Sequence, residues 1–205
     1  MKKFFSKYFE FIILGLTIIF LLTKPAFPKF GERISMIFFG TLSFYYLASG
    51  VLVFLDKNRI GRIMRLMYLF GLWSVSFSVL AIMTRTLLMQ MDKELLMISV
   101  SSGIGLMLFM LLYYIRLKTE DRETFKYLIQ PLFVRSLLAI FIATAFLLAG
   151  NYGIYNMFGT HKKDPVYIEK AVNAYEHPED SAIVNDFKNY DADLRGDSVS
   201  VGSGQ

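Results

Sequence analysis

Residues 59–85 read RIGRIMRLMYLFGLWSVSFSVLAIMTR, and this stretch decides the fold class. Its centre, residues 66–84, contains no charged side chain. A helix of that length rises about 1.5 Å per residue and so matches the hydrocarbon core of a bilayer, which is about 30 Å thick. Basic residues flank the apolar centre on both sides. We therefore interpret the stretch as a transmembrane helix, with topology anchors at Arg59, Arg62, Arg65 and Arg85.

Four more hydrophobic segments surround this one, at residues 8–23, 34–55, 95–115 and 132–150. The first follows the basic start MKKFFSK but has no small-x-small cleavage site, so we interpret it as an uncleaved span. The last is expected to begin at Pro131, because proline is tolerated in the first turn of a helix. The fold class predicted is an all-α integral membrane protein, with a five-helix transmembrane domain over residues 1–150. Loops are expected at residues 24–33, 56–62, 86–94 and 116–126.

Residues 151–205 form a polar tail with a different composition. Asp164 is a plausible N-cap and Pro165 the first residue of a helix over residues 164–175, and a second short helix is expected around residues 180–190. The final residues, GDSVSVGSGQ, are predicted to be disordered. The apolar face of the first tail helix is too small for a core of its own, so we expect it to bind a partner. The residues of this face are Val166, Ile168, Val172 and Tyr175.

Charge is distributed unevenly along the chain. Residues 1–150 carry 17 Lys and Arg against 8 Asp and Glu, whereas the tail carries 5 against 9. The basic residues cluster at the ends of the spans, which is typical of membrane topology and not of nucleic-acid binding. With the N-terminus inside, eleven basic residues flank the inner face and seven the outer face. We therefore expect a cytoplasmic N-terminus and a tail on the opposite side, in a bacterial inner membrane.

Several chemistries lack the residues that they need. The chain has no cysteine, and both histidines, His161 and His177, lie beyond the last span. Neither metal-ligand spacing nor a phosphate-binding loop nor a nucleophile elbow is present. We therefore expect no cofactor, no metal, no nucleic-acid partner and no enzymatic activity.

Small residues recur on one face of the third, fourth and fifth spans. Close backbone approach through small residues is how helices associate in lipid, where apolar burial cannot drive them together. The alternative is a hydroxyl-lined permeation path formed by the serines. Trp73 is expected to pack between helices. The predicted packing positions are Gly71, Ser74, Ser78, Ser99, Ser102, Gly103, Ala139, Ala143 and Gly150.

Glu10 and Arg135 are the charges placed most nearly within hydrophobic sequence. Each either reaches the headgroups along its own helix or pairs with the other. In the five-span topology both begin their spans at the inner face, so they lie at similar depth. We predict an ion pair that makes the first and fifth spans neighbours.

Three function classes follow. The first is a non-catalytic structural or assembly subunit of a larger membrane complex, bound to the lipid bilayer and to other membrane-protein subunits or itself. The second is a small oligomeric transporter or channel, which would need a polar path. The third, an intramembrane enzyme, is disfavoured because no nucleophile and base can be assembled.

Overall fold

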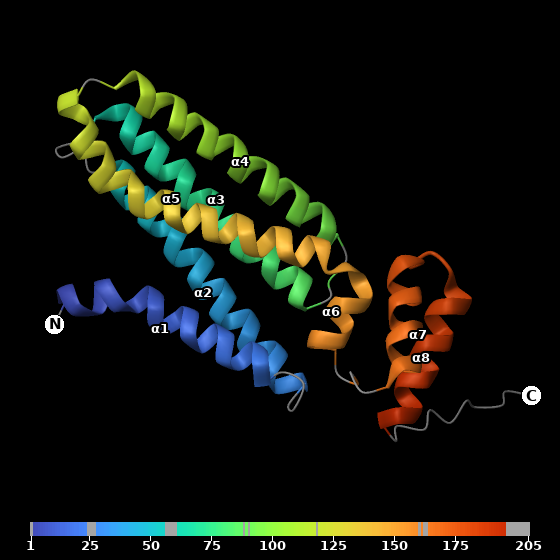
Figure 1. Cartoon of the computed structure of the whole chain (residues 1–205). Coiled ribbons are helices and arrows are strands. Elements are labelled where there is room, and N and C mark those ends of the chain that lie inside the picture. The colour runs from blue at the N-terminus through green and yellow to red at the C-terminus, as the bar shows by residue number, and fades with distance from the viewer. Residues whose placement is uncertain are drawn as a thin grey trace, which may run out of the picture. The chain divides into compact units, whose positions relative to one another are not determined.

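The computed structural model describes residues 2–23, 28–55, 61–87, 89, 91–117, 119–159, 161 and 164–195, and the chain divides into two compact units after Leu148 (Figure 1). All regular structure among these described residues is helical. The first unit contains α1 (Lys2–Thr23), α2 (Pro28–Leu55), α3 (Arg62–Thr86), α4 (Asp92–Arg116) and α5 (Thr119–Leu148). The second contains α6 (Gly150–Phe158), α7 (Pro165–Glu176) and α8 (Ser181–Arg195).

Four helices of the first unit are long and apolar enough to cross a membrane, namely Gly31–Leu55, Arg62–Thr86, Asp92–Arg116 and Ile129–Leu148. Helix α1 adds a shorter apolar stretch, Tyr8–Leu22. The chain is thus an all-α, multi-pass integral membrane protein in contact with the lipid bilayer.

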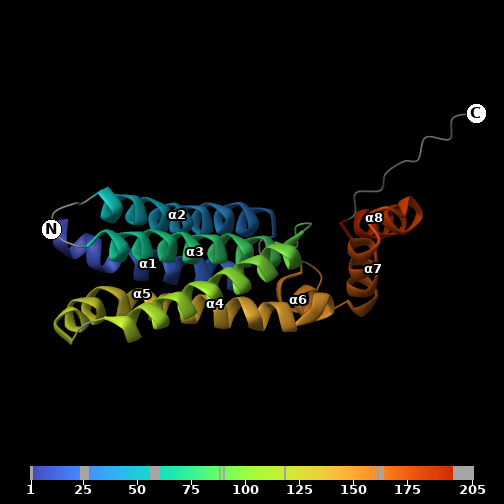
Figure 2. The same ribbon diagram turned by 90° about the horizontal axis from the view of Figure 1, so that it is seen from above.

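Helix α3, predicted from the opening stretch, is the centre of the first unit. It packs against α2, α4 and α5, whereas α1 lies on α2 (Figures 1 and 2). Its apolar stretch is 56% buried, against 22–28% for the other three candidate spans. Met67, Leu72 and Ala81 are buried almost completely along it. The helices around α3 therefore present most of their apolar side chains to lipid.

Two helices begin earlier than the sequence predicted. Helix α2 starts at Pro28, within the expected loop, because proline suits a first helical turn. Helix α5 starts at Thr119 and absorbs most of the expected charged loop, so Pro131 lies in its interior and not in its first turn. An interior proline leaves the carbonyl four residues earlier, that of Tyr127, without its helical donor. Such prolines are tolerated in membrane helices, where neighbouring groups can satisfy the freed carbonyl.

Helix α5 ends at Leu148, and Gly150 begins α6 with a φ of 65°. That left-handed conformation is open to glycine at little cost, because glycine has no Cβ. Gly150, predicted to be a packing position of the fifth span, is exposed and lies outside α5. Helix α6 was not predicted from the sequence.

The second unit follows the predicted capping pattern. The Asp164 carboxylate accepts hydrogen bonds from the backbone N–H groups of Val166 and Tyr167, at 3.0 and 3.2 Å, and Pro165 is the first residue of α7. Helix α7 packs against both α6 and α8. The rings of Tyr167 and Phe187 meet edge to face, with centroids 5.4 Å apart. The end predicted to be disordered, residues 196–205, lies outside the described residues.

Candidate functional site

Polar side chains inside the membrane unit bind one another where helices meet. The hydroxyls of Ser43 on α2 and Ser76 on α3 lie 2.7 Å apart, and Ser76 Oγ also donates to the Ser43 carbonyl at 2.9 Å. Ser99 Oγ of α4 donates to Ser78 Oγ of α3 at 2.7 Å. These pairs satisfy hydroxyls that lipid cannot, and they hold α2 and α4 on α3.

Six of the nine predicted packing positions are buried, whereas Ser102 and Gly150 are exposed. A Cβ added to Gly71 would come within 2.4 Å of Leu132 Cδ2, and one added to Gly103 within 2.8 Å of Ile140. Ala139 and Ala143 are buried on the same side of α5. A larger side chain at Gly71 or Gly103 would force the Leu132 or Ile140 side chain of α5 to move.

The serines do not line one continuous path. The Ser78 and Ser99 hydroxyls are buried and bonded to each other. Ser74 and Ser102 instead line an apolar hollow of about 700 Å³ at the surface of α3 and α4. Trp73 borders this hollow and is 41% exposed, so the prediction that it packs between helices was wrong.

Glu10 and Arg135 form the ion pair that the sequence predicted. Arg135 Nε and Nη2 donate to the two carboxylate oxygens of Glu10, at 2.8 and 2.6 Å. The Tyr46 hydroxyl donates to Glu10 Oε1 at 2.7 Å. The pair joins α1 to α5, and α2 supplies the third partner. Bidentate geometry of this kind fixes the relative register of two helices.

The expected depth of Arg135 needs correction. It is sixteen residues past the start of α5 and therefore about 24 Å along that helix, not one turn from its end. Measured from Ile129, where the apolar stretch begins, it is about 9 Å along. Glu10 is two residues, about 3 Å, past the start of the apolar stretch of α1, Tyr8–Leu22.

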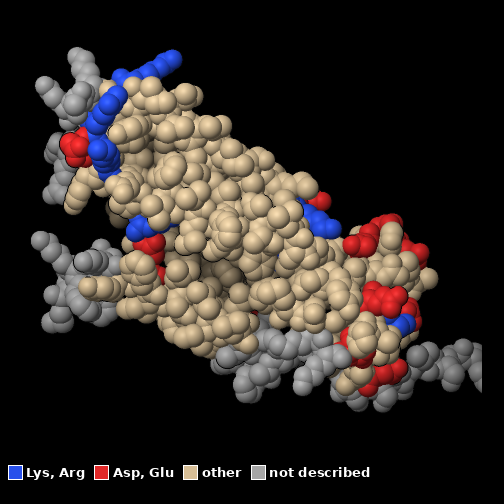
Figure 3. All heavy atoms as spheres, viewed as in Figure 1, with Lys and Arg blue, Asp and Glu red and all other residues tan. Residues whose placement is uncertain are grey.

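The ion pair lies in a groove between α1 and α5 whose floor is formed by α2 and α3 (Figure 3). The groove encloses about 770 Å³. Its lining changes along its length. Polar groups occupy one section, with Lys126, Gln130 and Arg135 on α5 and Glu10 on α1. The remaining section is apolar, bordered by Leu14, Ile18, Leu21, Leu138, Ile142 and Phe146.

A second ion pair closes the α3–α4 hairpin. Arg85 Nη1 donates to Asp92 Oδ2 at 3.0 Å, and both side chains are almost completely buried. Arg85, predicted as a topology anchor, is thus buried at the end of α3 and paired with Asp92. Asp92 was missed, although an acidic residue in the first turn of a span, seven residues after a basic one, was a usable signal.

The other predicted anchors differ among themselves. Arg62 is exposed in the first turn of α3. Arg65 is half-buried, and its Nη1 donates to the Phe54 carbonyl at 3.1 Å, so it ties α3 to α2. Arg59 lies outside the described residues.

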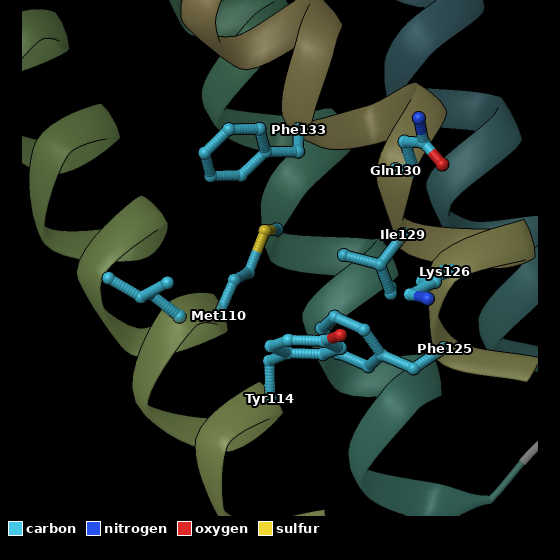
Figure 4. Close-up of a pocket in the computed structure, with 8 residues that line it drawn as sticks. Met110, Tyr114, Phe125, Lys126, Ile129, Gln130 and Phe133 are labelled. Carbon is cyan, nitrogen blue, oxygen red and sulfur yellow. The ribbon is translucent and has the colours of Figure 1, made fainter. Parts of the chain in front are cut away.

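A smaller cavity of about 330 Å³ lies between α4 and α5 (Figure 4). The Tyr114 and Phe125 rings border it, with centroids 5.5 Å apart, and Met110 points into it from α4. Lys126 borders both this cavity and the groove.

The predicted partner-binding face of α7 is divided between buried and exposed residues. Ile168 is 2% exposed, whereas Val166 is 46% exposed. Val172 and Tyr175 are half-buried, and the Tyr175 ring meets that of Tyr155 on α6. Part of this face is therefore covered within the protein. Among the described residues no group of three His, Asp or Glu side chains could hold a metal ion.

These observations define the protein as a multi-pass helical membrane protein with charged groups paired inside its membrane unit. No protein-family model matches the chain, and comparison with curated proteins and with solved structures finds no match.

Proposed function

We propose that the chain is a non-catalytic structural or assembly subunit of a larger membrane complex. Two ion pairs within its membrane unit join helices: Glu10–Arg135 joins α1 to α5, and Arg85–Asp92 joins α3 to α4. A group held in such a pair is poorly placed to act on a substrate. Its partners are other membrane-protein subunits or a second copy of the chain.

One outward-facing site on α4 carries this proposal. Ser101 and Gly105 are exposed one turn apart, and a Cβ added to Gly105 meets nothing within 4 Å. Two glycines inside the unit are instead covered, because Leu132 lies over Gly71 and Ile140 over Gly103. Small residues one turn apart allow two helices to approach closely in lipid. The open site on α4 fits a helix from outside this chain.

Purification in mild detergent followed by mass spectrometry tests the proposal. The wild-type chain should recover a membrane-protein partner in stoichiometric amount, or a second, differently tagged copy of itself. Gly105→Leu should lower this recovery about tenfold or more. Ala145→Leu adds similar bulk at an exposed position of α5 and is the matched control. Equal recovery by both variants and the wild type would show that α4 is not the contact.

The tail is proposed as a second contact. Val166 leaves part of the α7 surface exposed, and α8 is rich in acidic residues. Deleting residues 164–205 should leave membrane insertion intact and weaken partner recovery. Unchanged recovery of every co-purifying protein would remove the tail from the interface.

We also propose five spans, a cytoplasmic N-terminus and a tail on the opposite side of a bacterial inner membrane. Helix α1 supplies the fifth span, because its 22 residues extend about 33 Å. Reporter fusions after Lys7, Arg62, Arg122 and Gly196 test this topology. An inside signal at both Lys7 and Gly196 would contradict an odd number of spans.

The alternative function is a small oligomeric transporter or channel. The observation in its favour is the Glu10–Arg135 pair, since charges within membrane helices often mark a transport path. Purified protein in liposomes should then conduct ions or small solutes, and Arg135→Gln should abolish the flux. Flux through the variant equal to that of the wild type would remove this alternative.

A further inference from the structure

The groove between α1 and α5 has a lining that is graded from charged to apolar. Beyond the ion pair, the groove extends over eleven further residues of each helix. It reaches Leu21 on α1, counted from Glu10, and Phe146 on α5, counted from Arg135. This section is about 16 Å long, which is about half the hydrocarbon thickness of a bilayer. An acyl chain of one leaflet has that reach.

The groove is open to the surroundings of the membrane unit along this section. Ile18 is 50% exposed and Leu138 54% exposed, one on each wall. The volume of about 770 Å³ is that of a small-molecule site. A transmembrane helix is about 10 Å wide and 30 Å long and needs several times that volume. The dimensions therefore favour a single flexible chain over a helix.

The residues that line the polar section carry one net positive charge, and Glu123 beside Lys126 does not line the groove. Lys126 and Arg135 contribute two cations and Glu10 one carboxylate, and Gln130 stands between them on α5. Lys126 also contacts Glu123 at 3.2 Å. Both partners of that contact are at least half exposed, so it is weak and easily exchanged. A headgroup with a negative charge complements this section.

We propose that the groove is a binding site for one anionic membrane phospholipid, with its phosphate near Lys126 and an acyl chain between α1 and α5. The headgroup occupies the polar section, and the chain extends past the ion pair to Leu138, which is about 18 Å along α5 from Lys126. This site does not depend on the assembly proposed for α4, which lies on another surface.

Tryptophan quenching by brominated lipids tests the site in the full-length protein. Trp73→Phe removes the native tryptophan, and Leu138→Trp then places one in the groove. Leu137→Trp is the matched control, because Leu137 is 51% exposed on the next residue of the same helix and does not line the groove. Each protein is placed in phosphatidylcholine vesicles containing brominated phosphatidylglycerol or brominated phosphatidylcholine.

At position 138 phosphatidylglycerol should quench at an about fivefold lower mole fraction than phosphatidylcholine, the gain expected from one basic side chain. At position 137 the two lipids should quench equally. Lys126→Glu should remove the preference at 138, whereas Arg116→Glu, at the end of α4, should keep it.

Three results would overturn the proposal. Equal quenching by the two lipids at position 138 would show that the groove has no charge preference. The same preference at 137 and 138 would show a general attraction of anionic lipid to the basic end of the protein. Protection of 138 from both lipids would show that protein covers the groove.

Discussion

The two ion pairs of the membrane unit join residues that have very different separations in the sequence. Glu10 and Arg135 are 125 residues apart and meet in a groove, where the Arg135 side chain remains 32% exposed. Arg85 and Asp92 are seven residues apart, on either side of one short connection, and are almost completely buried. The first pair links two helices that are far apart in the sequence and form opposite walls of the groove. The second closes a hairpin whose two helices are already adjacent in sequence.

The largest loss of unfolding free energy is expected when the buried Arg85–Asp92 pair is broken. Arg85→Met keeps the length of the side chain but removes the cation beside Asp92. Removing one partner of a buried pair costs about 3–5 kcal/mol of unfolding free energy. Denaturant unfolding in detergent measures this loss. Arg85→Met with Asp92→Leu should recover most of it, and no recovery would show that the buried charge is not its cause.

A smaller loss is expected for the pair in the groove, where part of Arg135 stays accessible. Glu10→Arg and Arg135→Glu should each lower the free energy of unfolding by about 1–3 kcal/mol. The double swap should restore most of it, because the two charges again have opposite sign. If the double swap is as unstable as the sum of the single changes, the pair does not hold α1 against α5.

The next smaller loss of unfolding free energy is expected for a hydrogen bond between two neutral side chains. Ser99→Ala removes the bond to Ser78 and should cost about 0.6 kcal/mol, the average for a polar contact between membrane helices. Ser102→Ala is the control, because its hydroxyl donates only to the Ser99 carbonyl of its own helix. Equal unfolding free energies for the two variants would contradict a stabilising contact between α3 and α4.

The smallest effect on stability is expected in the tail, where the carboxylate of Asp164 is in contact with water. Hydrogen bonds from the Tyr190 hydroxyl and from the backbone N–H groups of Tyr167 and Val166 hold the pKa of Asp164 below its ordinary value. At pH values above the ordinary pKa of aspartate, these bonds therefore stabilise α7 and α8. This stabilisation is lost as the pH falls through the lowered pKa of Asp164. The hydrogen-exchange protection factors of α7, which correct for the intrinsic effect of pH, should decrease at acidic pH in the wild type. Asp164→Asn should remove most of that pH dependence, and a dependence equal to the wild type would assign it to other carboxylates.

The sequence was most informative where single residues have few options. Residues 66–84, uncharged over 19 positions, had to be a buried or membrane-spanning helix, and the structure places α3 at the centre of the unit. Asp164 followed by proline predicted the start of α7 to the residue. Glu10 and Arg135 were predicted to meet because an isolated charge within an apolar helix needs a partner.

The sequence was least informative where packing or long-range contacts decide. The sequence did not show that α5 includes the charged residues before Pro131, because proline is also typical of the first turn of a helix. Arg85 has the same sequence context as a surface anchor, and its burial depends on where Asp92 lies. The groove depends on α1 lying on α2 while α5 lies on α3, which no single segment encodes.

Pro131 gives α5 a particular mechanical property. The helix lacks one hydrogen bond at the turn that ends there, so α5 bends more easily at this turn than elsewhere. Lys126 lies before that turn and Arg135 after it. Bending at Pro131 therefore moves Lys126 while Arg135 stays attached to α1 through Glu10. The entrance of the groove can widen or narrow without any change in the contact that holds its two walls together.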